Sequence, residues 1–482
     1  MELTLIGAAE LTLALALFAF GSMRALFALV IGSTLLGGSA AVYLGALGGS
    51  SISPAHFALG LLMLRCLIPG GIGVEGMVAA LRANGWLVVF VAYGVVAALV
   101  LPRIFAGEID VTPLRGQIRP RYGTEVARIL AVEPLHFTAQ NLTTAVYMIG
   151  TLAMALTTHA VLRGPGGARM LARCAAAIGT LHALTGFAGV ALRGSPLEAV
   201  FLFLRNGSYA QMDHEWGGFV RMNGLWPEAS SFAAFAVVWF VFNFECWLRR
   251  IEARRTGMAA LLLGLALVAS TSSTAYIGLA LFAVIMVLRT ATTPRLLPTD
   301  RVAWIAIATL SAIIAATTMM VLNPALAAAM RGLLEHMTLD KAGSFSGRQR
   351  LFWASQGPDA FLVSYGLGIG PGSFRSSSLA SAILGSTGVI GVGAFLLHLG
   401  RAYAPLAAST FRRSGDTGRD TAAAAAWAML VGVGVASVSA PSCDPGLTFA
   451  ILSGAAIALR TGSPRAAKHA VPAMPTGLLQ TA

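Results

Sequence analysis

The chain has 482 residues, of which 56% are hydrophobic and only 11% are charged. Soluble domains carry about 25% charged residues, so this composition excludes an ordinary water-soluble protein. The formal net charge is +13, but the basic residues are spread between apolar segments rather than gathered in one stripe. We therefore expect a lipid bilayer, and no nucleic acid, among the partners of this protein.

Apolar segments recur along the whole chain at about the 20-residue length that a transmembrane helix needs. They predict thirteen spans, at 3–20, 24–44, 54–72, 84–102, 138–162, 169–191, 228–247, 257–271, 274–289, 302–322, 378–400, 420–440 and 445–460. One long tilted helix is the alternative over 257–289. The first span follows no basic region and carries Glu2 and Glu10, which favours a retained helix over a cleaved signal peptide. The predicted fold is an all-α polytopic bundle of 12–13 transmembrane helices.

Arginine-rich connections alternate with these spans, and the positive-inside rule places them in the cytoplasm. They lie around Arg163, Arg249, Arg289, Arg412 and Arg460. This orientation predicts the following organisation of one functional unit in the bacterial inner membrane. N-terminal helices occupy 1–102, a helical hairpin 138–191, further helices 228–322 and 378–460, a cytoplasmic tail 461–482, and long periplasmic loops 103–137, 192–227 and 323–377.

The three long loops contain aromatic and apolar residues and are not of low complexity. Connections of more than about 15 residues are usually functional or disordered. We interpret these loops as a periplasmic cap over the bundle, with a short interfacial helix at 196–207.

The first candidate site is RMNGLWPEASSF, from Arg221 to Phe232, where the second long loop meets a span. Pro227 and Glu228 suit the start of a helix, and Ser230 can bond local backbone groups. Either this segment is only a helix start, or it presents Arg221 and Glu228 together at the membrane surface.

The second candidate site is SFSGRQRLFW, from Ser344 to Trp353, in the third long loop. On an extended segment Arg348 and Arg350 would point to the same side, whereas on a helix they would diverge by about 200°. Two arginines side by side clamp a diphosphate well. Contact with lipid headgroups is the simpler alternative.

The third candidate site is GLGIGPGSF, from Gly366 to Phe374, followed by Arg375. It follows no strand of a βαβ unit, so it is not a dinucleotide-binding loop. Its glycines either bring backbone amides close to a ligand or only permit tight turns. Histidines and cysteines form no cluster with ligand spacing, and Asp444 lies in an Asp-Pro-Gly turn, so we expect no metal or other cofactor.

The order of these motifs resembles the O-antigen polymerase and O-antigen ligase superfamily of bacterial envelope polysaccharide biosynthesis. The resemblance covers about 215–400 and includes R-x-x-G-x-x-x-E-x-S, S-T-S-S-T, S-G-R-x-x-x-x-W, G-x-G-x-G-x-F and G-S-T-G-V-I-G. It implies a fold similar to the GT-C class and an enzyme acting on undecaprenyl-diphosphate-linked oligosaccharide. It also implies a chain-length regulator and a flippase as further partners. The ligase branch typically carries a histidine before the glycine-rich span, and SFRSSSLASAILGSTG has none, which favours the repeat-unit polymerase branch over the ligase.

The sequence thus predicts a polysaccharide polymerase, a membrane glycosyltransferase making exopolysaccharide, capsule or O-antigen. Arginines would stabilise the charge that grows on the departing diphosphate, and Glu228 would accept the proton of the acceptor hydroxyl. The predicted catalytic residues are Arg221, Glu228, Arg348 and Arg350, and the predicted substrate-binding residues are Gly224, Ser230, Ser346, Trp353, Gly370, Gly372 and Arg375. A ligase is one alternative, and a transporter or flippase with a charge inside the membrane at Arg65 is another.

Overall fold

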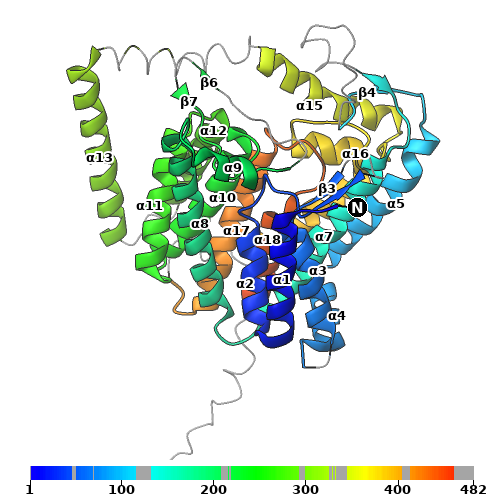
Figure 1. The fold of residues 1–482 in the computed structure, drawn as a ribbon, viewed down its shortest axis with the longest axis horizontal. Coiled ribbons are helices and arrows are strands. Elements are labelled where there is room, and N and C mark those ends of the chain that lie inside the picture. Colours follow the sequence, from blue (N-terminus) through cyan, green and yellow to red (C-terminus); the bar gives the residue numbers. More distant parts are fainter. Residues whose placement is uncertain are drawn as a thin grey trace, which may run out of the picture.

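The computed structural model describes residues 2–45, 50–68, 70–114, 132–207, 215–216, 219–292, 299–324, 328, 332, 345–403 and 413–460. This part of the chain is an all-α bundle with a few short strands (Figure 1). The helices are α1 Leu5–Phe20, α2 Met23–Ser33, α3 Pro54–Leu67, α4 Gly73–Ala83, α5 Gly85–Ile104, α7 Ala139–Leu162, α8 Gly167–Ala191, α9 Glu198–Leu204, α10 Ala229–Leu248, α11 Ala253–Ala269, α12 Ser273–Thr292, α13 Thr299–Leu322, α15 Phe345–Val363, α16 Leu379–Tyr403, α17 Thr417–Ala436 and α18 Gly446–Leu459.

The strands are short and form three separate antiparallel sheets. They are β1 Glu2–Leu3, β2 Val42–Leu44, β3 Ser50–Ile52, β4 Asp110–Val111, β5 Glu133–Pro134, β6 Glu215–Trp216 and β7 Phe219–Val220. In the first sheet β2 lies between β1 and β3, while β4 pairs with β5 and β6 pairs with β7.

Each of the thirteen apolar ranges contains a helix, and six of these helices are long and apolar enough to cross a membrane. The six are α5, α7, α8, α10, α12 and α16. Four more apolar helices, α1, α2, α3 and α18, have 10–17 residues. The protein is therefore an all-α membrane protein whose helices differ widely in length.

One predicted span is wrong in its second half. The apolar run 24–44 begins as α2 but leaves the helix after Ser33 and ends as strand β2. Two glycines allow this, since Gly37 lies against the ring of Trp226 and the Gly38 amide donates to the Leu225 carbonyl at 2.9 Å. Hydrophobicity alone does not distinguish such a buried loop and strand from a longer helix.

Helix α10 lies at the centre of the bundle and packs against α8, α11, α12 and α17. Its sequence explains this position, because apolar residues occur on every side of it, as expected of a helix surrounded by other helices. Phe232, Phe235, Trp239 and Phe242 are all buried, and the ring of Trp239 makes edge-to-face contacts with those of Phe235 and Phe242. The same packing fixes the first residues of α10, where the first candidate site lies.

The elements of the three long connections gather at one end of the bundle, which we call the loop end (Figure 1). It carries α9, α15 and strands β4 to β7. The opposite end carries described arginines of the short connections, and we call it the arginine end. They include Arg163, Arg401 and Arg460 and, around one cavity, Arg169, Arg250 and Arg413. Helix α9 confirms the short helix expected within 196–207.

Candidate functional site

The first candidate segment is a sharp turn that ends in helix α10. Strand β7 leads into it, and the chain reverses where the Trp226 amide donates to the Asn223 carbonyl at 2.8 Å. Gly224 sits in this turn with φ +51° and lies against the Phe232 ring and the backbone of Gly186. A side chain there would force the turn away from α8, so the structure gives Gly224 a packing role.

Glu228 is the residue directly before α10, in an extended conformation. Its carboxylate accepts hydrogen bonds from the hydroxyl groups of Ser230, at 2.5 Å, and of Ser231, at 3.3 Å. It does not accept a backbone N–H of the first turn, so it is not an ordinary helix cap. The positive end of the helix favours its negative charge, and the two serines hold it in a defined position at the loop end.

Arg221 is half-buried beside this carboxylate. Burial lowers the pKa of its guanidinium, the nearby Glu228 raises it, and Arg350 lowers it again. The Nε atom of Arg221 is buried and has no hydrogen-bond partner among the described residues. The charge of Glu228 and that of Arg350, from a distant part of the chain, therefore both act on Arg221, which keeps an unused donor.

Arg348 and Arg350 do not lie side by side, because FSGRQRLFW, from Phe345, forms the start of helix α15 rather than an extended segment. Residues two apart on a helix point in directions about 200° different. Arg348 is exposed and Arg350 is half-buried. The helical alternative therefore holds and the two arginines form no paired clamp. Of the two, Arg350 acts on the charge of Arg221.

Two further contacts position Arg350 and the residues after it. The Ser377 hydroxyl, just before α16, donates to the Arg350 carbonyl at 2.5 Å. The Arg375 guanidinium covers the ring of Trp353 at 4.3 Å, and the Arg375 amide donates to the Thr112 carbonyl at 2.8 Å. Ser346 lies in the first turn of α15, with its side chain outside the described part of the structure.

The glycine-rich segment is a buried connection between α15 and α16. Gly366, Gly368, Gly370 and Gly372 all have φ between +82° and +94°, which other residues rarely adopt. The Gly370 amide donates to the Ser386 carbonyl at 3.1 Å, and its α-carbon lies against Ala97 and Pro102 of α5. Gly372 lies against the Gln140 backbone of α7. These contacts give both glycines a conformational role.

Asn141 explains why this connection follows such an irregular course. It is buried near the start of α7, where its side-chain amide donates to the Pro371 carbonyl and the Ser373 hydroxyl, both at 2.9 Å. The connection is thereby tied to α7 and passes between α5, α7 and α16. Nothing in the sequence pattern marked Asn141.

Asp444 is a second carboxylate that sequence reasoning assigned only to a turn. It lies just before α18, and the Thr151 hydroxyl in the middle of α7 donates to it at 2.7 Å. Helix α18 has 14 residues and rises about 21 Å, less than the roughly 30 Å of a bilayer core. The turn before α18 therefore lies between the neighbouring helices rather than beyond their ends. The shortness of the last predicted span was the sequence feature that could have indicated this.

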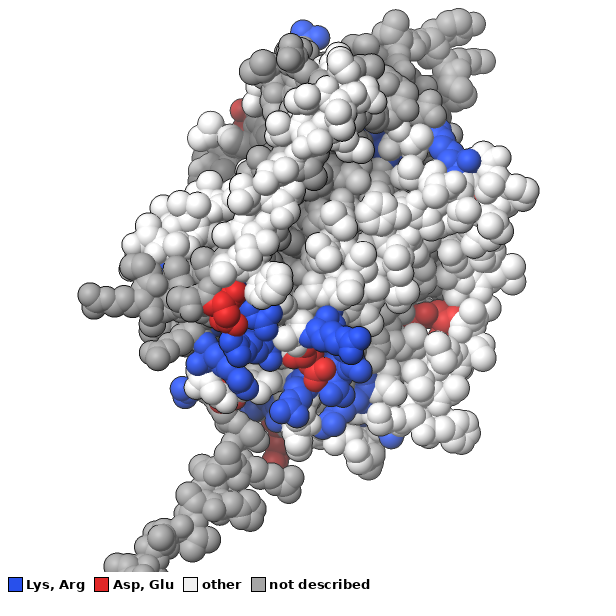
Figure 2. Space-filling model, turned by 90° about the vertical axis from the view of Figure 1, so that its left-hand side faces the viewer, with Lys and Arg blue, Asp and Glu red and all other residues white. Residues whose placement is uncertain are grey.

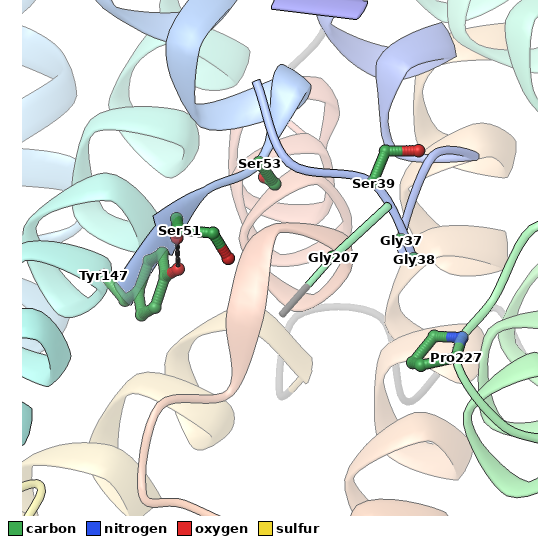
Figure 3. Close-up of a pocket in the computed structure, with 8 residues that line it drawn as sticks. All are labelled: Gly37, Gly38, Ser39, Ser51, Ser53, Tyr147, Gly207 and Pro227. Carbon is green, nitrogen blue, oxygen red and sulfur yellow. Dashed lines mark hydrogen bonds between the residues drawn. The ribbon is translucent and has the colours of Figure 1, made fainter. Parts of the chain in front are cut away.

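A small cavity lies beside the Glu228 segment (Figure 3). It has a volume of about 70 Å³ and is lined by Gly37, Gly38, Ser39, Ser51, Ser53, Tyr147, Gly207 and Pro227. Figure 3 shows the Tyr147 ring turned toward Ser51, whose carbonyl accepts its hydroxyl hydrogen. Hydroxyl groups and small residues thus surround a space next to the residue that precedes Glu228.

Arg65 does not lie in the middle of a span. It occupies the last turn of α3, where the helix dipole favours a positive charge, and its guanidinium lies 5.9 Å from the centre of the Phe18 ring. Among the described residues no group of three His, Cys, Asp or Glu side chains comes together as a metal site would require.

Comparison with models of known protein families, with curated proteins and with solved structures finds no match to this chain.

Proposed function

We propose that this protein is a membrane glycosyltransferase that polymerises undecaprenyl-diphosphate-linked oligosaccharide repeat units at the periplasmic face of the bacterial inner membrane. The observation that carries the proposal is the half-buried guanidinium of Arg221 at the loop end, on which the charges of Glu228 and Arg350 both act. Two cations for a leaving diphosphate and one carboxylate for an entering hydroxyl are the groups that this transfer needs.

The reaction joins the growing glycan to the next lipid-linked repeat. The oxygen of the acceptor hydroxyl attacks the anomeric carbon of the donor glycan, while Glu228 accepts the proton of that hydroxyl. The bond from that carbon to the diphosphate oxygen breaks, and undecaprenyl diphosphate leaves with the electron pair. Attack from the side opposite the diphosphate inverts the anomeric centre.

Arg221 and Arg350 stabilise the negative charge that develops on the diphosphate. Loss of one such contact typically costs 10²–10³ in rate, or roughly 3–4 kcal/mol of barrier. Half-burial strengthens this effect, because charges interact more strongly away from bulk water. The hydroxyl-lined cavity beside Pro227 supplies groups that bond to sugars.

The test compares two arginines that are two residues apart on α15. A strain lacking the gene receives the wild type, Arg350→Ala or Arg348→Ala, and lipid-linked glycans are extracted and sized by mass spectrometry. We expect single repeat units to accumulate with Arg350→Ala, and near-normal polymer with the exposed control Arg348→Ala. Protein levels in the membrane are measured for each variant.

Other outcomes identify other functions. Full-length polymer that remains on the lipid carrier in the deletion strain would identify a ligase. Normal polymer with Arg350→Ala, together with loss of function on substitution of Arg65, would favour transport and contradict the proposal.

A further inference from the structure

A polar cavity opens at the arginine end, far from the site described above. Its volume is about 330 Å³, and its lining consists of Arg169, Arg250, Ile251, Glu252, Ala253, Arg413, Thr417 and Asp420. Figure 2 shows basic and acidic side chains gathered at this end, below a broad surface almost free of charge. A band of charge bordering an apolar surface marks the level of lipid headgroups.

One part of the cavity is electropositive. Helices α8, α11 and α17 all begin beside it, at Gly167, Ala253 and Thr417. Helix starts present backbone N–H groups and a partial positive charge. Arg169 and Arg413 add full charges, and neither forms an ion pair within the part of the chain that the structure describes, whereas Arg250 is paired with Asp300 at 2.6 Å.

Another part of the cavity has an unused acceptor. Asp420 is 1% exposed, and one carboxylate oxygen accepts the Ser414 amide at 2.9 Å. The other oxygen is buried without a hydrogen-bond partner among the described residues. Glu252 differs, because Arg173 and Arg255 already pair with it, at 2.9 Å and 3.5 Å. A buried carboxylate oxygen without a donor is costly unless a ligand supplies one.

The two parts lie close enough for the charge of Arg413 to act on Asp420, and a ligand with an anion and a cation close to each other matches both. A phosphate alone satisfies the arginines and leaves Asp420 without a donor. We propose that this cavity binds a phosphoethanolamine group, with its phosphate at Arg169 and Arg413 and its ammonium at Asp420. Because the cavity lies where α8 begins, and α8 is long and apolar enough to cross a membrane, the source is the headgroup of phosphatidylethanolamine.

The experiment measures lipid binding to the purified, delipidated full-length protein by native mass spectrometry. Phosphatidylethanolamine and phosphatidylglycerol with identical acyl chains are titrated separately in detergent. We expect the wild type to bind one phosphatidylethanolamine about tenfold more tightly than phosphatidylglycerol, a difference of about 1.4 kcal/mol. Asp420→Asn should abolish this preference, and Arg169→Gln combined with Arg413→Gln should weaken both lipids about tenfold.

Arg254→Gln is the matched control, since Arg254 is an exposed arginine at the same end outside the cavity. It should bind both lipids as the wild type does. Equal affinity of the wild type for the two lipids, or unchanged binding by the double arginine variant, would overturn the proposal. The first of these results needs no variant, so it stands even where a variant fails to fold. If soluble O-phosphoethanolamine binds as tightly as the lipid, the cavity recognises the phosphoethanolamine group, and the proposal that a lipid supplies this group is overturned.

Discussion

Thr151, in the middle of α7, donates a hydrogen bond of 2.7 Å to Asp444 in the turn before α18. Burial raises the pKa of Asp444 to about 6, although the hydrogen bonds from Thr151 and the Gly446 amide oppose the shift. Its pKa in the unfolded chain is near 3.8. The folded protein therefore holds a proton on Asp444 in a pH range where the unfolded chain has released it.

This difference makes stability depend on pH. A carboxyl group with a raised folded pKa destabilises the fold as pH rises from about 4 to about 6, and the penalty stays constant above that range. We expect Asp444→Asn to raise the free energy of unfolding at pH 7.5 by up to about 3 kcal/mol, with no such gain near pH 4. Thermal unfolding of the wild type and the variant in detergent at both pH values measures this gain in the free energy of unfolding. A gain of equal size at both values would contradict the assigned pKa shift.

Glu228→Gln tests the proposed base separately from the arginines. The amide keeps the size of the side chain but cannot accept the proton, so we expect the rate of polymer formation to fall by roughly 10²–10⁴ with donor binding retained. Purified enzyme and lipid-linked repeat units provide the measurement, as kcat and KM. Ser231→Ala is the control, because it removes only the 3.3 Å hydrogen bond to this carboxylate. Unchanged turnover with Glu228→Gln would restrict Glu228 to a structural role.

The glycine connection predicts a contrast between two Gly→Ala substitutions. Gly370 has φ +94°, and a methyl group there would lie 2.7 Å from the Ala97 carbonyl oxygen, so Gly370→Ala should destabilise the fold by roughly 1–3 kcal/mol or more. Gly393, inside α16, has open space at the same position, and Gly393→Ala should stabilise the fold by about 0.5–1 kcal/mol. Thermal unfolding compares the two. Similar effects would mean that the connection does not require glycine.

The positions of the helices could be predicted from the sequence, because a long apolar run indicates a segment buried in lipid or protein. The backbone of such a segment must form its hydrogen bonds with itself, which favours a helix. The conformation of the candidate segments could not be predicted in this way. The period of hydrophobicity does not reveal that FSGRQRLFW is helical, since α15 is amphipathic only weakly and carries Pro358 inside it. Arg350 was accessible as one of two arginines in this motif, and its separation from Arg348 follows from the helix. Its effect on Arg221 depends on packing between distant segments.

Residues that act through such packing were missed for the same reason. Asn141 and Thr151 are ordinary polar residues of a long apolar helix, and only the folded chain brings them to Pro371 and Asp444. Glu228 was accessible because its place before a helix can be read locally from Pro227 and the two serines. The sequence therefore predicted the residues whose surroundings are local, and the structure added those whose partners are far along the chain.

A buried ion network at the arginine end provides the last test, which concerns stability alone. Glu245 of α10 is fully buried and pairs with Arg249 at 3.2 Å and with Arg289 of α12. The Arg289 guanidinium also lies 4.1 Å from the centre of the Trp427 ring on α17, so one carboxylate neutralises the charges that join three helices.

We expect Glu245→Gln to lower the free energy of unfolding by about 3–5 kcal/mol, because it removes the carboxylate that pairs with two buried guanidinium groups. Asp300→Asn is the control, since the side chains of Asp300 and its partner Arg250 are 51% and 52% exposed, and water screens their attraction to within about 1 kcal/mol. Thermal unfolding of both variants in the same detergent makes the comparison. Equal destabilisation by the two variants would mean that burial adds nothing to the Glu245 pairs. A much larger loss with Glu245→Gln than with Asp300→Asn, as expected here, would mean that these pairs hold α12 and α17 against α10.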